Sequence, residues 1–143
     1  MQSSARSTPP AAFALPGLLR QRGFEVTRFE PGQRVNPAGT DLILYLFGED
    51  TLLTRSRIFI DWAALMGGFE GAMARFWHDV PTAMMSFGYP YYQYDAPRVP
   101  PYIKAYCTLA QMQKAVVDLT LGNGDWNHNS PVDPFCGLPD AAY

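Results

Sequence analysis

Two short apolar runs constrain the fold of this chain more than any other feature of its sequence. The first is Leu-Ile-Leu-Tyr-Leu-Phe at residues 42–47, and the second begins at Thr82 and ends at Phe87. Apolar runs of this length are typical of strands that lie in a parallel sheet covered on both faces. The two runs therefore predict a domain in which helices pack on either side of a sheet.

Further strands and helices are expected around these runs. Gly23 is expected to end the first helix, because glycine readily adopts the left-handed backbone that follows a helix. Asp61 can cap the second helix through its carboxylate, and Thr108 with Gln111 has the spacing of a capping box at the start of the third. The additional strands are expected at residues 24–29 and 102–107, which gives a four-stranded sheet, and the helices at residues 11–22, 62–77 and 108–121.

Apolar residues recur at helical spacing in the second and third predicted helices, so we expect them to face the sheet. Gly67 and Gly68 lie within the second helix and weaken it by about 1 kcal/mol each relative to alanine. The expected inward residues are Trp62, Leu65, Met66, Phe69, Met73 and Phe76 in the second helix, and Leu109, Met112, Val116 and Leu119 or Leu121 in the third.

The order of these elements indicates the fold class. Strands that alternate with helices predict a flavodoxin-like or Rossmann-like three-layer α/β sandwich with a mostly parallel sheet. A doubly wound domain normally opens with a strand that lies inside the sheet, whereas this pattern opens with a helix. We therefore expect either another topology or a domain that lacks its first strand, with an apolar slot in the sheet that invites edge-mediated pairing of two copies. Residues 1–10 are expected to be frayed, residues 11–143 to form a single domain, and the chain to be irregular from about residue 123.

Composition excludes several classes of function. The chain has 143 residues, of which 48% are hydrophobic and 17% charged, with a net charge of −2 and no basic cluster; this pattern does not suit nucleic-acid binding. The apolar runs are too short to cross a membrane, and the first residues lack the apolar core of a signal peptide. Cys107 and Cys136 lack metal-ligand spacing. No GxGxxG or GxxxxGK[ST] motif occurs, so we expect no cofactor. A cytoplasmic location is predicted.

The candidate binding residues follow the second apolar run. They lie in a segment that leaves the carboxyl end of a predicted strand, the edge where ligands of open α/β sheets bind. Pro90 and Pro97 stiffen this segment, and tyrosines offer flat apolar rings with a polar tip, which suits a sugar or another protein. We name residues 89–98 the tyrosine segment; its candidate residues are Tyr89, Tyr91, Tyr92, Tyr94, Asp95 and Arg98.

Catalytic interpretations of individual residues are weaker than structural ones. His78 and Asp79 are neighbours at a helix end, which is a poor geometry for a dyad. Glycoside hydrolysis needs two carboxyl groups about 5–10 Å apart, but Asp61 is explained as a helix cap and Asp133 as a turn residue before proline. Asp95 is best explained as a loop carboxylate that binds nearby backbone, and Cys107 as an inert thiol. No catalytic residue and no metal ligand is therefore predicted in this chain.

Several motifs, taken together and in order, resemble the C-terminal domain of family 3 glycoside hydrolases, and in particular the β-N-acetylhexosaminidase-type branch. The similarity covers the chain from about Phe13 to its end. The motifs are Ser56-Arg-Ile-Phe-Ile-Asp-Trp62, Trp77-His-Asp-Val-Pro81, Ser86-Phe-Gly-Tyr-Pro-Tyr91, Tyr94-Asp-Ala-Pro97, Tyr102-Ile-Lys-Ala-Tyr106 and Ser130-Pro-Val-Asp-Pro-Phe-Cys-Gly137.

The resemblance implies an enzyme in which a (β/α)₈ barrel precedes an α/β sandwich and carries the nucleophilic aspartate. In this branch the barrel is also thought to carry the acid/base. A chain of 143 residues cannot hold such a barrel beside this domain, so we expect a non-catalytic accessory domain whose partner is a glycosidase barrel. Its tyrosine segment would pack on the barrel or border its sugar site. The alternative is a self-sufficient flavodoxin-like domain that binds a small ligand at its strand ends, with Asp95 or His78 as candidate catalytic groups.

Overall fold

The computed structural model describes residues 13–30, 33, 36–48, 60–73, 79–96, 99, 101–127, 129–135 and 137. Within these residues a sheet of three parallel strands forms the centre of the molecule, in the order β1-β2-β3. The strands are β1 (Ile43–Gly48), β2 (Thr82–Phe87) and β3 (Tyr102–Lys104). The α/β class, the parallel sheet and both apolar runs are therefore confirmed.

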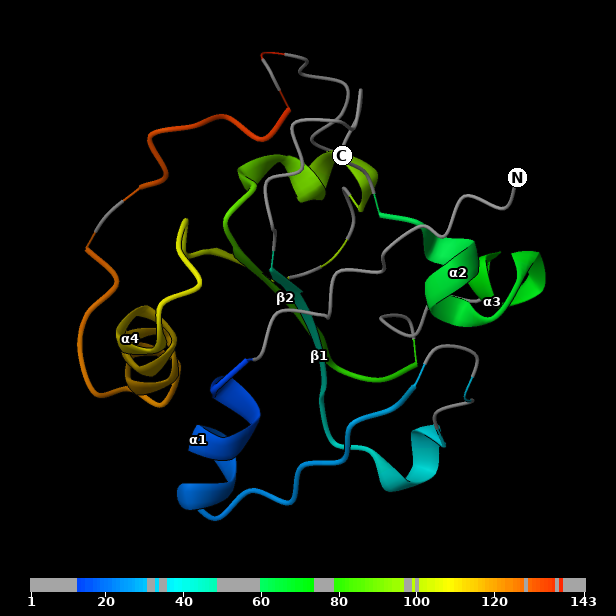
Figure 1. The fold of residues 1–143 in the computed structure, drawn as a ribbon, viewed down its shortest axis with the longest axis horizontal. Helices are drawn as coiled ribbons and strands as arrows, with labels where there is room; N and C mark the ends of the chain where they lie inside the picture. Colours follow the sequence, from blue (N-terminus) through cyan, green and yellow to red (C-terminus); the bar gives the residue numbers. More distant parts are fainter. Residues whose placement is uncertain are drawn as a thin grey trace, which may run out of the picture.

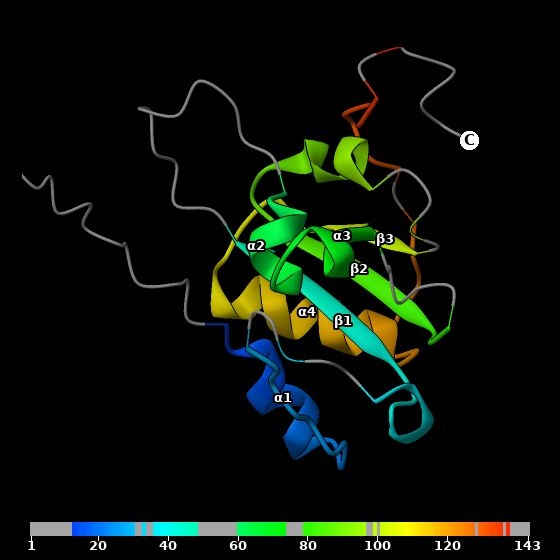
Figure 2. The ribbon, with the colours of Figure 1, turned by 90° about the vertical axis from the view of Figure 1, so that its right-hand side faces the viewer.

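Helices cover both faces of the sheet. Figure 1 shows α1 (Leu15–Gln21) and α4 (Ala110–Thr120) on one side of β1 and β2, and α2 (Trp62–Met66) with α3 (Phe69–Met73) on the other. Figure 2 views the sheet face on, with α2 and α3 in front of it and α1 and α4 behind. Two short 3₁₀ helices, η1 (Pro37–Gly39) and η3 (Pro90–Asp95), complete the regular elements of the described residues.

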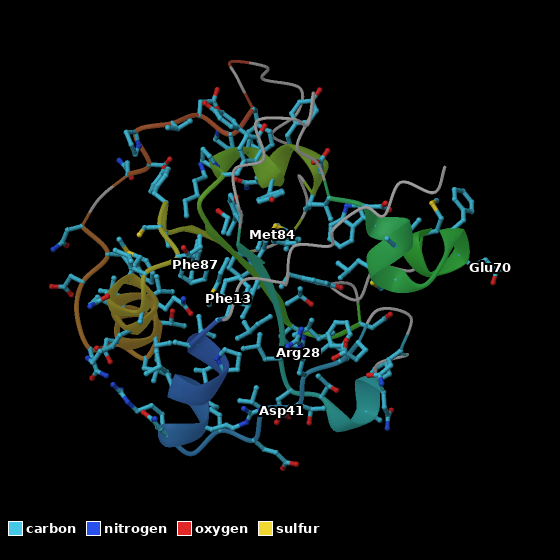
Figure 3. All side chains as sticks on the ribbon, in the orientation of Figure 1. Phe13, Arg28, Asp41, Glu70, Met84 and Phe87 are labelled. Carbon is cyan, nitrogen blue, oxygen red and sulfur yellow. The ribbon has the colours of Figure 1, made fainter. Side chains whose placement is uncertain are left out.

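Strand β2 divides the core into two clusters, because its successive side chains point to opposite faces. Met84 lies with Tyr45 and Trp62 on the α2 side, whereas Met85 and Phe87 lie with residues of α1 and α4 on the other side. The Phe13 and Phe87 rings meet there, with centroids 5.7 Å apart (Figure 3). All six residues of β2 are buried, so this strand is the centre of both halves of the core.

The sheet differs from the prediction in its number of strands. The segment 24–29 is extended but pairs with no strand of the described residues. Phe24 is 49% exposed, and the Val26 carbonyl accepts a hydrogen bond at 2.8 Å from the Arg20 guanidinium instead of from a neighbouring strand. The predicted fourth strand is therefore wrong. β1 pairs directly with β2 and β2 with β3, so the expected slot inside the sheet is absent from this part of the chain.

The predicted helix at 62–77 is interrupted. Asp61 caps α2 as expected, with its Oδ1 accepting from the Ala64 N–H at 2.9 Å. The helix then ends at Gly67, whose φ of 76° is left-handed, and a new helix begins at Phe69. Phe69 and Met73 were expected in the core but are 77% and 69% exposed, because the break rotates α3 away from the sheet. Phe76 and the rest of the predicted helix lie outside the described residues.

Two predictions for the third helix are wrong: its capping box and two of its inward residues. The strand before this helix is also shorter than predicted. Strand β3 ends before residue 107, because Tyr106 adopts a positive φ of 54°. The capping box is absent: α4 begins at Ala110 with no side-chain cap. Leu109 and Met112 are 64% and 37% exposed, whereas Val116 is buried as expected. The predicted end of the first helix is confirmed, since Gly23 follows α1 with a φ of 91°.

Gln113 takes the inward position on α4. It is 2% exposed; its Oε1 accepts from the Leu15 N–H at 3.0 Å, and its Nε2 donates to the Thr108 carbonyl at 2.7 Å. The amide thereby supplies a partner to the start of α1 and to the turn before α4, and so joins the two helices on this face.

We expect Gln113→Leu to lower the free energy of unfolding by about 1–3 kcal/mol, because it leaves the buried Leu15 N–H without its partner. The measurement is urea unfolding followed by circular dichroism, where the midpoint should fall at an unchanged slope. Gln111→Leu is the matched control, because Gln111 is exposed on the same helix. An equal loss in both variants would contradict the role given to the buried amide.

Candidate functional site

The tyrosine segment lies at the carboxyl end of the sheet. Gly88 and Tyr89 follow β2 directly, and residues 90–95 then form η3. Pro90 occupies the first turn of this helix, where its fixed φ suits a helix start. Figure 1 shows η3 above the strand ends. Residues 90–95 of the segment thus form a short helix at the predicted edge of the sheet.

Aromatic rings connect this helix to the core. Tyr89 contacts both Tyr91 and Tyr92 at centroid distances of 5.3 Å, and Tyr92 contacts Phe47 at 4.9 Å. The contacts continue through the sheet face from Phe47 to Tyr45 at 6.4 Å and from Tyr45 to Trp62 at 5.5 Å. Apart from the stacked Tyr45–Phe47 pair, these rings meet edge-on or tilted, and aromatic pairs of both kinds add to the stability gained by burial alone.

The four tyrosines of the segment differ in exposure. Tyr92 is only 7% exposed and belongs to the core cluster on the α2 side, whereas Tyr94 is 48% exposed. Tyr89 and Tyr91 are half-buried. Tyr94 is therefore the tyrosine whose ring is most open to a ligand or a partner. Arg98, the last candidate residue, lies outside the described residues.

Asp95 is the last residue of η3, and its carboxylate binds nearby backbone, as the structural interpretation predicted. Its Oδ2 accepts from the Ile60 N–H at 3.2 Å, and its carbonyl accepts from the Trp62 Nε1–H at 3.1 Å. These contacts join the end of η3 to the residues that begin α2. The two carboxylates in this region, Asp61 and Asp95, thus both accept backbone N–H groups.

Tyr102 holds the start of the same segment. Its hydroxyl lies 2.8 Å from the Ser86 Oγ and donates to the Pro90 carbonyl at 3.2 Å. Burial raises the pKa of Tyr102 to about 12, although the Ser86 hydroxyl opposes this rise. Ser86 is itself fully buried at the end of β2, so this polar pair lies between the sheet and η3.

A second cluster of polar side chains lies at the end of β3. Lys104 donates to the Ser130 Oγ at 3.3 Å and to the Val132 carbonyl at 3.2 Å, and the Tyr106 hydroxyl also contacts Ser130. Burial lowers the pKa of Lys104, while Asp133 opposes this change. The contacts hold the irregular segment after α4 against the strand. No local sequence pattern indicates this group, because the residues it joins are 24–28 positions apart.

Two of the other candidate residues, Asp133 and Cys107, contact nearby backbone N–H groups. The Asp133 carboxylate accepts from the N–H groups of Phe135 and Gly137, and these bonds lower its pKa; this confirms its interpretation as a turn residue. Cys107 is half-buried, and its Sγ accepts from the Leu109 N–H at 3.4 Å. Asp79 is exposed. His78 and Cys136 lie outside the described residues.

In the part of the chain that the structure describes, no group of three or more His, Cys, Asp or Glu side chains is placed to hold a metal ion. In the same residues, no helix has the length and apolar character needed to cross a membrane.

Comparison with known proteins identifies relatives that are much longer than this chain. No family model matches. The chain is 34% identical over 131 residues to a beta-N-acetylglucosaminidase/beta-glucosidase of Cellulomonas fimi, a match that covers 85% of this chain and 23% of the relative. Two solved structures of the beta-glucoside phosphorylase BglX are also similar, each at 30% identity. For the structure bound to 2FGlc the TM-score is 0.73, and the match covers 87% of this chain and 22% of the BglX chain. For the other structure the TM-score is 0.70, and the match covers 99% of this chain and 25% of the BglX chain. The chain thus spans about a quarter of the length of these relatives.

The buried phenol of Tyr102 predicts sensitivity to alkaline pH. Because its pKa is raised from 10.0 to about 12 in the folded chain, its contribution to stability is fully present below pH 10 and is lost as the pH rises towards 12. The Tyr102→Phe variant keeps the ring without the titrating group, so its melting temperature should fall less steeply across this range.

The measurement is thermal unfolding at several pH values, together with absorbance at 295 nm to follow phenolate formation. Tyr94→Phe is the control, because Tyr94 is 48% exposed and is not among the groups that shift the pKa of Tyr102. Parallel alkaline slopes for wild type and Tyr102→Phe would contradict the prediction.

Proposed function

We propose that the chain is a non-catalytic C-terminal accessory domain of a family 3 glycoside hydrolase, because it is similar to part of the length of such enzymes. The enzyme would act on β-linked N-acetylhexosamine or a related sugar. The observation that carries the proposal is the extent of the match: the similarity covers 85% of this chain but 23% of its C. fimi relative. A separate catalytic part is the partner that this proposal requires.

The environment of the carboxylates supports the non-catalytic role. A glycosidase needs one carboxyl group that gives up a proton and a second that attacks or activates water. Asp61 holds the first turn of α2, Asp95 holds the Ile60 N–H, and Asp133 holds a turn. Each of these groups has a structural task, so the reacting carboxylates are expected on the partner.

The tyrosine segment is the surface we assign to contact with the partner or its sugar. It lies at the carboxyl edge of the sheet, where ligands of open α/β folds bind. Tyr94 presents an exposed ring there, next to Asp95 at the end of η3. An aromatic face suits the apolar face of a pyranose or a protein side chain, and the phenol adds a hydrogen-bonding tip.

The alternative is a self-sufficient flavodoxin-like domain that binds a small ligand at the same edge. The position of η3 favours it, since this edge is the general ligand site of the fold whatever the parent protein is. The DNA upstream of the coding sequence distinguishes the two: an in-frame barrel supports the accessory domain, and an unrelated neighbour supports the alternative.

We expect the purified chain not to hydrolyse aryl β-N-acetylglucosaminides. The assay is release of p-nitrophenol from the β-N-acetylglucosaminide and the β-glucoside, with the C. fimi relative as positive control. Turnover above background that Asp95→Asn abolishes would contradict the non-catalytic role and support the alternative.

We also expect the domain to bind N,N′-diacetylchitobiose weakly through Tyr94. Loss of one aromatic contact is worth about 0.5–1.5 kcal/mol, so Tyr94→Ala should weaken binding roughly 2–10-fold. The measurement is NMR titration of the ¹⁵N-labelled chain. Trp126→Ala is the matched control, because Trp126 is 57% exposed on the segment after α4. Equal effects of the two variants would contradict a specific role for Tyr94.

A further inference from the structure

The helix η3 of the tyrosine segment is held at both of its ends and in its middle by different elements of the fold. We propose that Tyr102 is a positioning residue: its hydroxyl fixes the start of this segment, so that the Tyr94 ring is presented in one orientation before a ligand or partner arrives. This inference rests on the proposed function of the segment as a contact surface.

The first attachment depends on the register of β2 and β3. Tyr102 pairs with Met84 in the parallel ladder, and its hydroxyl reaches Ser86, two residues further along β2 on the same face, at 2.8 Å. The same hydroxyl donates to the Pro90 carbonyl at 3.2 Å. One phenol therefore connects both neighbouring strands to the first residue of η3.

The Tyr102 ring has little freedom to move. It packs against the core cluster on the α2 side, and the Lys104 ammonium lies 5.7 Å from its centroid. Ser86 is fully buried, so its hydroxyl is available to Tyr102 in a fixed place. The hydrogen bond to Pro90 consequently sets where η3 begins.

The middle and the end of the segment are attached independently of Tyr102. In the middle, the buried Tyr92 ring packs on Phe47 at 4.9 Å. At the end, Asp95 binds the Ile60 N–H and accepts from the Trp62 Nε1–H, and Ala96 behind it is fully buried. Loss of the Tyr102 hydroxyl should therefore loosen the start of η3 without releasing the segment from the domain.

Such support matters because a 3₁₀ helix has poor internal hydrogen-bond geometry and is seldom stable by itself. Tyr94, between two fixed points, is the exposed aromatic residue of the helix. A ring that is already ordered loses less conformational entropy on binding than one on a mobile loop. The fixed start of η3 thereby favours binding at Tyr94 without contributing any contact to the ligand.

The test is hydrogen exchange of the full chain by NMR, comparing Tyr102→Phe with wild type. Phenylalanine keeps the ring and removes the hydroxyl, so the amides of residues 91–94 should exchange roughly 5–10-fold faster, as expected for the loss of one buried hydrogen bond. The amides of α4, on the opposite face, should exchange within about twofold of wild type when referred to the global stability of each variant.

Two variants serve as comparisons. Ser86→Ala removes one contact of the Tyr102 hydroxyl but leaves the hydrogen bond of that hydroxyl to the Pro90 carbonyl. Its effect on residues 91–94 should therefore be smaller than that of Tyr102→Phe. Ser86→Ala also tests the proposal if Tyr102→Phe folds poorly. Tyr106→Phe removes the hydroxyl that contacts Ser130 and should leave the amides of residues 91–94 unchanged.

Chitobiose affinity separates this inference from the proposed function. If wild type binds, Tyr102→Phe should weaken binding about 3–10-fold although residue 102 does not touch the sugar. If wild type does not bind, the sugar contact is wrong, and the exchange data alone decide the positioning role. Unchanged exchange at 91–94, or an equal increase across η3 and α4, would overturn the inference.

Discussion

The pairing of β1 with β2 is the interaction on which the rest of this structure depends. The two strands run parallel over six residues, from Ile43 opposite Thr82 to Gly48 opposite Phe87, and β2 is buried along its whole length. A strand with apolar side chains on both faces needs a layer of helices on each side of the sheet, because its apolar surface would otherwise be exposed to water. The α1–α4 layer, the α2–α3 layer and the two core clusters all follow from that requirement.

The same strand also places the candidate site. Strand β2 is the middle strand of the sheet. Where it ends at Phe87, the chain leaves the core at the carboxyl edge of the sheet and forms η3 from Pro90. Strand β3 pairs with the second half of β2, with Tyr102 opposite Met84, so the Tyr102 hydroxyl lies within reach of Ser86 and Pro90. The α2 layer supplies Trp62 to the other end of the segment. Besides β2, which leads into it, η3 is therefore supported by β3 and by the residues that begin α2.

Local sequence signals predicted well where one residue type has one dominant physical role. The buried run at 82–87, the carboxylate cap at Asp61 and the stop at Gly23 all appear as expected. Prediction failed where a second residue, outside the local pattern, decides the outcome. Alternation at 24–29 indicates a strand only if a neighbour pairs with it, and Arg20 binds Val26 instead. On α4, the amide of Gln113 occupies an inward position because Leu15 and Thr108 supply its partners, whereas Leu109 is 64% exposed.

The sequence by itself determined the class of the domain, the position of its central strand and the segment that carries the tyrosines, because these follow from apolar runs and from prolines that act locally. The tertiary structure alone decided which of those tyrosines is exposed. Tyr92 and Tyr94 are two residues apart and chemically identical, yet one contacts Phe47 and is buried while the other is 48% exposed. It also assigned Asp95 and Tyr102 to opposite ends of one helix, because hydrogen bonds across 12 and 35 residues depend on the register of the strands and on the path of α2, which no local pattern specifies.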